Sequence, residues 1–153
     1  MEEAIENIRG LDHLEGATVV ALGDGNVYDD IVVSDGAVTI PNPVTVAQIG
    51  LSYNCDIQTL PVNFQQEMVR GIKKGIREVT LHVVNTRGLS VGPSLTKLKP
   101  IKERTPQMGY GSVPAITGEQ DLTVTPNWSD FGQFFIRQSN PLPAHILSVS
   151  TRS

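Results

Sequence analysis

The stretch LGDGNVYDDIVVSDGAVTI, residues 22–40, carries four aspartates and two Asp-Gly pairs between runs of β-branched and apolar residues. Asp and Gly tolerate the positive φ angles of tight hairpin turns, so an Asp-Gly pair between such runs predicts a β-hairpin. The two pairs lie eleven residues apart, which is the spacing of a meander of short strands. The stretch therefore predicts antiparallel β-structure.

The flanking sequence extends this pattern into a small antiparallel β unit over residues 17–62. Strands are expected at 17–22, 27–34, 37–40 and 45–51. A unit of this size needs a neighbour to be stable. Residues 1–16 predict a helical or extended lead, in which Ile5, Ile8 and Leu11 would share one helix face and Gly10 would end the helix.

A second antiparallel unit is expected over residues 77–153. Its clearest strand is EVTLHVVNT (78–86), in which apolar Val79, Leu81 and Val83 alternate with the other face. Further strands are expected at 95–104, 121–126, 132–139 and 145–152. A short helix and basic linker, capped by Asn63, is expected over 63–76. The fold class is all-β: two small antiparallel units, meander-like or barrel-like, joined by a short helix.

The composition excludes several classes of protein. The single cysteine, Cys55, excludes an intramolecular disulfide and a multi-cysteine zinc site. No run approaches the roughly 18 apolar residues of a membrane span, and the acidic N-terminus lacks the apolar region of a secretory signal. These features predict a protein that is made in the cytoplasm and has no membrane span.

Charge is distributed unevenly along the chain. Residues 1–62 hold ten acidic residues and one basic residue, whereas residues 70–104 hold nine basic and two acidic ones. Either two solvated surfaces attract each other within a monomer, or the acidic half of one subunit meets the basic half of the next. The second interpretation predicts an interface. Its candidate residues are Arg70, Lys73, Lys74, Arg77, Lys97, Lys99 and Trp128.

The aspartates raise the alternative of a metal site or a catalytic site. Asp24, Asn26 and Asp30 offer spaced oxygens, but an EF-hand loop needs a Glu at its twelfth position, and that position here is Asp35. Neighbouring strand residues such as Asp29 and Asp30 point to opposite faces. Turn and solvated-strand roles are favoured, with a weak cation site near Asp24 as the alternative.

No other pattern predicts catalysis. The three histidines, His13, His82 and His145, have no zinc-ligand spacing, and nothing basic in the sequence beside Cys55 would activate its thiol. Nucleophile-elbow and phosphate-loop motifs are absent from the sequence. The basic run could contact nucleic-acid phosphates, but a pI near 5.3 argues against a dedicated binder. We therefore expect no catalytic residue, no cofactor and no metal.

Four segments in register resemble the tail and stabilisation-type structural proteins of short-tailed bacteriophages. They are LEGATVVALGDGNVYDDIVVSDGAVTIP (14–41), VAQIGLSYNCDIQTLPV (46–62), KKGIREVTLHVVNTRGLSVG (73–92) and GQFFIRQSNPLPAHILSV (132–149). Family members are typically longer, and this chain resembles their C-terminal part. The family is often labelled by a likeness to a domain of ubiquitin-activating enzyme, but adenylation and thioester motifs are absent here.

The resemblance implies a structural virion component of a phage or prophage. Such a subunit would sit in a tail or nozzle ring, contact other tail or portal proteins, and surround DNA without sequence-specific binding. It implies a homo-oligomer and no enzymatic activity. Two alternatives stay open. One is a carbohydrate- or surface-binding β module that uses Trp128, Tyr110 or Phe131, and the other is a small hydrolase that uses Asp24, Asp29 and Asp30.

Overall fold

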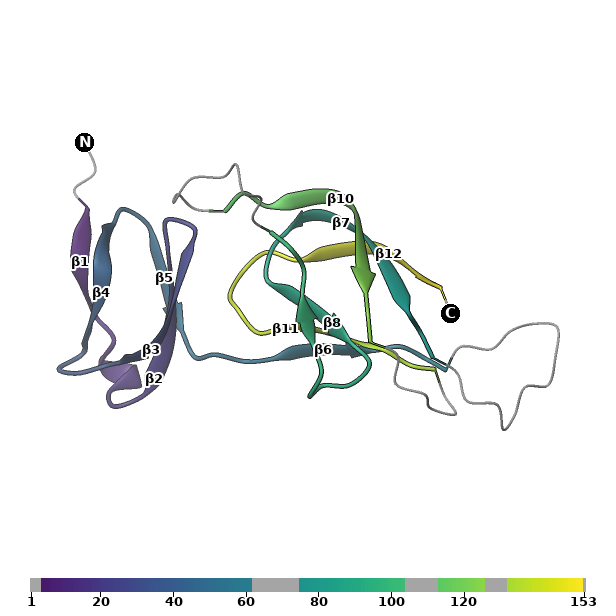
Figure 1. The fold of residues 1–153 in the computed structure, drawn as a ribbon. Coiled ribbons are helices and arrows are strands. Elements are labelled where there is room, and N and C mark those ends of the chain that lie inside the picture. The colour runs from purple at the N-terminus through teal and green to yellow at the C-terminus, as the bar shows by residue number, and fades with distance from the viewer. Residues whose placement is uncertain (1–3, 62–74, 104–112, 126–131, 153) are drawn as a thin grey trace. The chain divides into compact units, whose positions relative to one another are not determined.

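A computed structural model describes residues 4–61, 75–103, 113–125 and 132–152. In these residues the only helical element is the three-residue 3-10 helix η1 (Asp12–Leu14), and all strand pairs are antiparallel. The chain divides into two compact units (Figure 1). Unit 1 comprises the described residues 4–53 and 113, and unit 2 comprises 54–61, 75–103, 114–125 and 132–152. The all-β prediction is confirmed.

Unit 1 is built from two small sheets. One has the strand order β3-β2-β5 and the other pairs β1 with β4. The strands are β1 (Ile5–Arg9), β2 (Thr18–Gly23), β3 (Asn26–Val32), β4 (Ala37–Val44) and β5 (Ala47–Gly50). Apolar side chains from both sheets meet in the interior of the unit. The buried ones are Val19, Ala21, Val33, Val38, Ile40 and Val44.

Both Asp-Gly pairs form the turns that the sequence predicts. Asp24 and Gly25 have φ angles of 47° and 81°, and Asp35 and Gly36 have φ angles of 53° and 64°. Positive φ at both central residues is the geometry of the hairpin turn that Asp-Gly favours. The first turn joins β2 to β3, with Gly23 opposite Asn26.

The expected meander is wrong beyond this first hairpin. A meander would place β4 between β3 and β5. In the described residues β4 is instead in a sheet with β1, its contact back toward β3 is the single bridge Ala37–Ser34, and β5 pairs with β2. The strand β4 runs past Ile40 to Val44 and contains Pro41 and Pro43. Because proline has no N–H to donate, a strand with two prolines suits the edge of a sheet and not its middle.

The helical alternative for the N-terminal lead is also wrong. Residues Ile5–Arg9 form β1, with Ile8 opposite Val38 on β4. Ile8 packs against the buried apolar side chains of unit 1, whereas Ile5 is 49% exposed. Pairing with the free edge of β4 and burial of Ile8 outweigh the local helix-compatible pattern, and Gly10, with φ of 92°, ends the strand.

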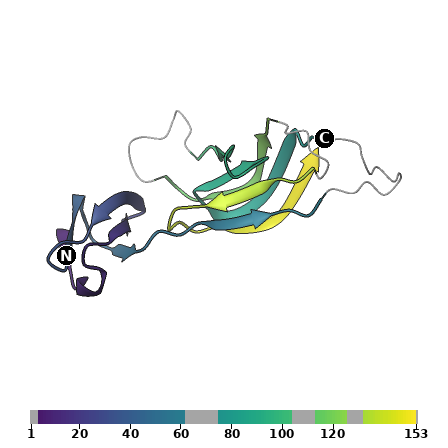
Figure 2. The same ribbon diagram turned by 90° about the horizontal axis from the view of Figure 1, so that it is seen from below.

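Unit 2 is a two-layer β-sandwich (Figures 1 and 2). One layer has the order β10-β7-β12, and the other has the order β6-β11-β8-β9. The strands are β6 (Cys55–Gln58), β7 (Glu78–Thr86), β8 (Leu89–Gly92), β9 (Lys99–Pro100), β10 (Ile116–Thr123), β11 (Phe135–Gln138) and β12 (His145–Arg152).

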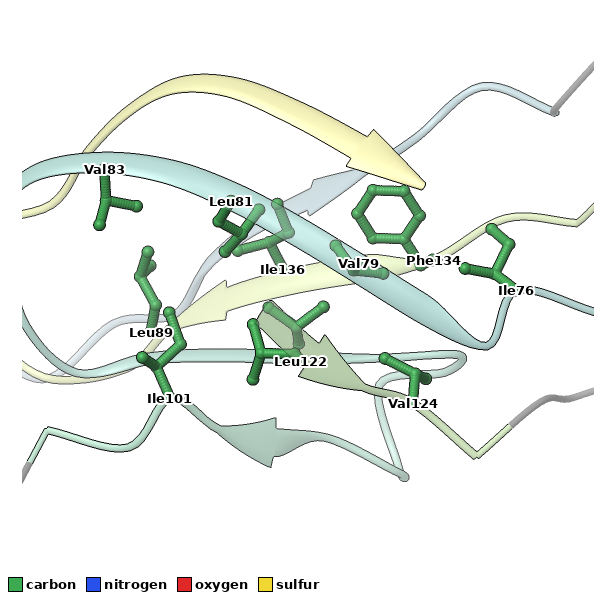
Figure 3. Packing of buried hydrophobic residues seen from close by; sticks show 11 residues of the cluster. Ile76, Val79, Leu81, Val83, Leu89, Ile101, Leu122, Val124, Phe134 and Ile136 are labelled. Atoms are coloured by element: carbon green, nitrogen blue, oxygen red, sulfur yellow. The ribbon is translucent and has the colours of Figure 1, made fainter. Parts of the chain in front are cut away.

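The interior of the sandwich is apolar (Figure 3). Val79, Leu81 and Val83 of β7 are at most 1% exposed, as the alternation of this strand predicts. They meet Val91 of β8 and Ile136 of β11 from the opposite layer. This contact between layers forms the core of unit 2.

The predicted strands of unit 2 agree with the structure to different degrees. The bounds of β7 and β12 agree with the sequence, whereas the strand expected at 95–104 contains only the two-residue β9. Nothing in the sequence pattern predicted β6, which pairs with β11. Consequently the first compact unit ends at Tyr53. The helix expected at 63–76 lies outside the described residues except for residues 75 and 76.

Gly92 lies where the backbone of the turn between β8 and β9 packs closely against β8. A Cβ at this position would collide with the backbone carbonyl of Lys97, which cannot rotate away. We expect Gly92→Ala to lower the free energy of unfolding by about 1–3 kcal/mol, measured by urea titration. Gly50→Ala is the control, because a Cβ there has nothing within 4 Å, and its effect should stay within about 0.5 kcal/mol. Equal effects would contradict the packing account.

Candidate functional site

The structure describes three of the seven predicted interface residues. Arg77, Lys97 and Lys99 are exposed on unit 2. The other four, Arg70, Lys73, Lys74 and Trp128, lie outside the described residues.

Two of these residues contact the same end of β10, Lys99 through its side chain and Arg77 through its backbone. The Nζ of Lys99 donates a hydrogen bond to the carbonyl oxygen of Thr123 at 3.3 Å. The carbonyl of Arg77 accepts from the N–H of Val124 at 2.8 Å. Lys97 lies just before β9, in a turn closed by its N–H to Ser94. The fold therefore gathers Arg77 and Lys99, which are 22 positions apart in the sequence, at one end of the sandwich.

Asp24 fastens the β4–β5 connection to the first Asp-Gly turn. Its carboxylate accepts from the N–H of Thr45 at 2.9 Å, the hydroxyl of Thr45 at 2.9 Å and the N–H of Val46 at 3.0 Å. Its own N–H donates to the carbonyl of Val46 at 3.0 Å. These hydrogen bonds, that from the Thr45 N–H foremost, lower the pKa of the Asp24 carboxyl.

Glu15 performs the equivalent task at the second Asp-Gly turn. Its two carboxylate oxygens accept from the N–H groups of Asp35 at 3.1 Å and Gly36 at 2.8 Å. Successive N–H groups in a turn of this kind form a concavity that binds anions, and here the anion is a side chain of the same unit. The sequence spacing gave no sign of this contact, which spans 20 residues.

Asp29 and Asp30 lie at an irregularity in the strand β3. Two residues of β3, Asp29 and Asp30, oppose the single residue Val20 of β2, and Asp30 has a φ of 56°. This is a β-bulge, which re-aims side chains and bends the strand. Among the residues that the structure describes, no group of three His, Cys, Asp or Glu side chains could hold a metal ion. The opening stretch therefore acts in the structure chiefly as corners and a bulge.

The three histidines and the single cysteine lie on different elements of the structure. His13 lies on η1, His82 on β7, and His145 at the start of β12. Cys55 is exposed on β6, next to Asp56. The Asp56 carboxylate binds the Arg137 guanidinium through two hydrogen bonds of 2.6 and 2.8 Å, and this contact lowers the pKa of Asp56.

A polar surface that the sequence did not predict lies on the outer face of the β10-β7-β12 sheet. Strand register places Asp121 and Ser150 on either side of Thr80, and the Thr80 hydroxyl donates to Asp121 at 2.7 Å. Two residues further along the same face, Arg152 lies opposite Glu78, and its guanidinium Nη1 is 3.4 Å from the carboxylate Oε2 of Glu78. A shallow hollow of about 190 Å³ lies over these residues. Its chemistry is hydrogen bonding by carboxylates, hydroxyls and one guanidinium.

The alternation of β7 was readable in the sequence, but this polar surface was not. It depends on which strands flank β7, and the flanking residues come from about 40 and 70 positions further along the chain. Strand order is a tertiary property, so no spacing in the sequence reveals it.

The chain matches no protein-family model and no curated protein sequence. Of the helices in the described residues, none has the length and apolar character needed to cross a membrane.

The Asp24 contact predicts a pH-dependent stability. A carboxyl whose pKa is lower in the folded state stabilises the fold above its unfolded pKa of about 4, and this stabilisation is lost as pH falls through the folded value. We expect Asp24→Asn to lower the free energy of unfolding at pH 7. We also expect it to reduce the further loss of stability on acidification below about pH 4. Urea titrations at several pH values measure both effects.

The matched control is Asp29→Asn, which changes an exposed aspartate on β3. It leaves the hydrogen bonds of Asp24 to Thr45 and Val46 in place, so it should lower the free energy of unfolding at pH 7 by less than Asp24→Asn does. If Asp24→Asn and Asp29→Asn behaved alike, the carboxylate contact to Thr45 and Val46 would not stabilise the turn.

Proposed function

We propose that this chain is a structural component of a phage or prophage tail and works through contacts between subunits, not through catalysis. The resemblance over four segments supports this function. The observation that carries it is the segregation of charge between the two units. The described residues of unit 1 hold seven acidic side chains and one basic side chain, whereas those of unit 2 hold five acidic and seven basic ones.

Segregated charge suits a head-to-tail contact. In a closed ring, each subunit presents one patch to a different patch on its neighbour. An acidic unit and a basic unit on the same chain supply two such complementary patches, and complementary potentials also orient the subunits as they meet. In this proposal Arg77, Lys97 and Lys99 of one copy face the acidic unit of the next copy, together with Arg70, Lys73 and Lys74.

The polar contacts of the described residues are consistent with a structural protein. The carboxylates of Asp24, Glu15 and Asp56 each join chain segments that are 20 or more positions apart. Carboxylates with such partners stabilise the fold and are less available for acid–base chemistry. The proposal therefore assigns the function to surfaces and not to a site of reaction.

A carbohydrate- or surface-binding module is the second candidate, and the hollow beside Thr80 is the observation that favours it. Carboxylates and hydroxyls such as those of Asp121 and Ser150 can hydrogen-bond to sugar hydroxyls. The aromatic residues that would form a stacking platform, Trp128, Tyr110 and Phe131, lie outside the described residues.

The ring proposal predicts an oligomer that salt weakens. Light scattering coupled to size exclusion should give a mass above that of the monomer in about 0.05 M salt and a lower average mass in about 0.5 M salt, because salt screens exposed charges. The double charge reversal Lys97→Glu with Lys99→Glu should lower the mass at low salt. Reversal of Lys73 and Lys74 should act in the same direction.

The control replaces the same two lysines by arginines, which preserves the charge. Assembly that tolerated the reversals as well as the conservative changes would contradict the charge-based contact. A monomer at both salts whose tryptophan fluorescence changes on adding glycans would favour the binding module instead.

A further inference from the structure

Among the described residues of unit 2, no strand pairs with the outer edge of β12 or of β6, and we call this side of the sandwich the open side. The contact from Lys99 to Thr123 brings β9 and β10 together on one side. Because β12 and β6 end the strand orders of their sheets away from β10 and β9, these two strands lie on the opposite side. In Figure 2 the yellow strand β12 and the blue strand β6 run along the same side of unit 2.

Inward-facing apolar side chains are poorly covered on this open side. Val149 of β12 lies opposite the buried Leu81, and Ile57 of β6 lies opposite the buried Ile136, so both point toward the interior. They are nevertheless 39% and 47% exposed. On the other side, Leu122 of β10 faces the interior in the same way and is only 6% exposed. In the part of the chain that the structure describes, the sandwich interior is therefore covered at β10 and poorly covered at β12 and β6.

The two sides also differ in how their strand edges are protected. Exposed edges are normally blocked by charges, proline, bulges or short length. The side formed by β10 and β9 has all four of these features. Strand β10 carries the charges Glu119 and Asp121 and has a bulge near Gly118, and β9 is only two residues long and contains Pro100. By contrast, β12 has eight residues, no proline and one fixed charge, Arg152, and it is regular from Ser148 to Arg152 after a bulge between Ile146 and Ser148.

The charges of the open side are already paired within the chain. Arg152 at the end of β12 lies 3.4 Å from Glu78, and Asp56 on β6 is bound by Arg137. Two copies of this side would therefore meet without strong repulsion between like charges. The Leu147 side chain at the bulge of β12, 62% exposed, adds further apolar surface.

We propose that the open side binds the same side of a second copy around a two-fold axis. In this arrangement β12 pairs antiparallel with β12 of the second copy, which extends the three-stranded sheet to six strands. The inward-facing apolar side chains of both copies, Ile57 and Val149 among them, are then buried along the seam. A contact between identical patches requires a two-fold axis, and an antiparallel pair of identical strands has that symmetry.

This contact goes beyond the proposed function, because it does not depend on the charge-based contact between units. Backbone pairing and apolar burial are insensitive to salt, whereas the ring contact weakens in salt. A dimer that persists in about 0.5 M salt is therefore the signature of the β12 contact. The two contacts can succeed or fail independently.

The first test places a charge on the seam. Val149→Lys and Ile57→Lys should each weaken dimerisation in about 0.5 M salt by tenfold or more, because the seam would bury an unpaired charge. Sedimentation equilibrium measures the dissociation constant. Leu95→Lys is the matched control, since Leu95 is 40% exposed but lies in a loop outside every strand. It should leave the dimer unchanged.

The second test detects the two-fold axis by disulfide cross-linking. It does not require a lysine in place of an inward-facing apolar side chain, which could also destabilise the fold. In a Cys55→Ser background, single cysteines are placed in turn at residues 147–151 and exposed to a mild oxidant. In a two-fold pair, one position lies next to its own copy at the axis, so one position or two neighbouring positions should give disulfide-linked dimers rapidly. A cysteine at residue 95 reports random collision.

The outcomes separate the two proposals. A salt-resistant dimer with cross-linking at the β12 axis, and no salt-sensitive assembly, would support this contact and overturn the ring. A salt-sensitive oligomer that ignores both lysine changes, with uniform cross-linking along 147–151, would overturn this contact and leave the ring standing. A monomer at all salts without cross-linking would overturn both.

Discussion

The burial of the inward face of β7 is the interaction on which unit 2 depends. Val79, Leu81 and Val83 are almost fully buried, and β7 is the only strand in its sheet with a neighbour on both sides. Burying three such side chains contributes several kcal/mol. The buried hydroxyl of Thr86 at the end of β7 also accepts from the N–H of His145 at 2.9 Å, which fixes where β12 begins. Strand β7 thus positions the polar outer face, the sealed side and the open side.

Unit 1 depends on a different constraint, because its strands are short and its turns are tight. Two carboxylates, those of Asp24 and Glu15, satisfy backbone N–H groups in connections that have no strand partner. Hydrogen bonds to an ionised carboxylate are stronger than neutral ones, so each carboxylate holds its connection in one conformation although most of the N–H groups are exposed. These two residues are also among the seven acidic residues that give the described part of unit 1 its negative charge. Fold stability and surface charge therefore have a common source in this unit.

The two sides of the sandwich connect the structure with the proposed functions. Two carboxylates on β10 and a proline in the very short β9 protect that side against pairing with another strand, whereas β12 has no proline and one fixed charge, and it is regular from Ser148 to Arg152. Proteins that act alone usually protect every edge. A subunit of an assembly can leave an edge free where another chain pairs with it. The asymmetry of the edges and the segregation of charge are the two observations on which the proposed contacts between copies rest.

The sequence by itself determined the local features that depend on a few neighbouring residues. The Asp-Gly turns, the all-β class and the bounds of β7 follow from preferences for φ angles and from alternation of apolar residues. Pro41 and Pro43 also contained the information that β4 is an edge strand, although the meander prediction did not use it. Strand β6 was missed because its residues are all exposed and show no alternation.

Only the tertiary structure decided which strands are neighbours. The pairing of β1 with β4, the contact of Glu15 with the second turn, and the grouping of Thr80 with Asp121 all join residues at least 20 positions apart. Such pairings depend on how whole faces of sheets cover each other, and burial of a face can override local preference, as at Ile8. The candidate surfaces of this protein are products of strand order, and strand order is set by the packing of the complete units.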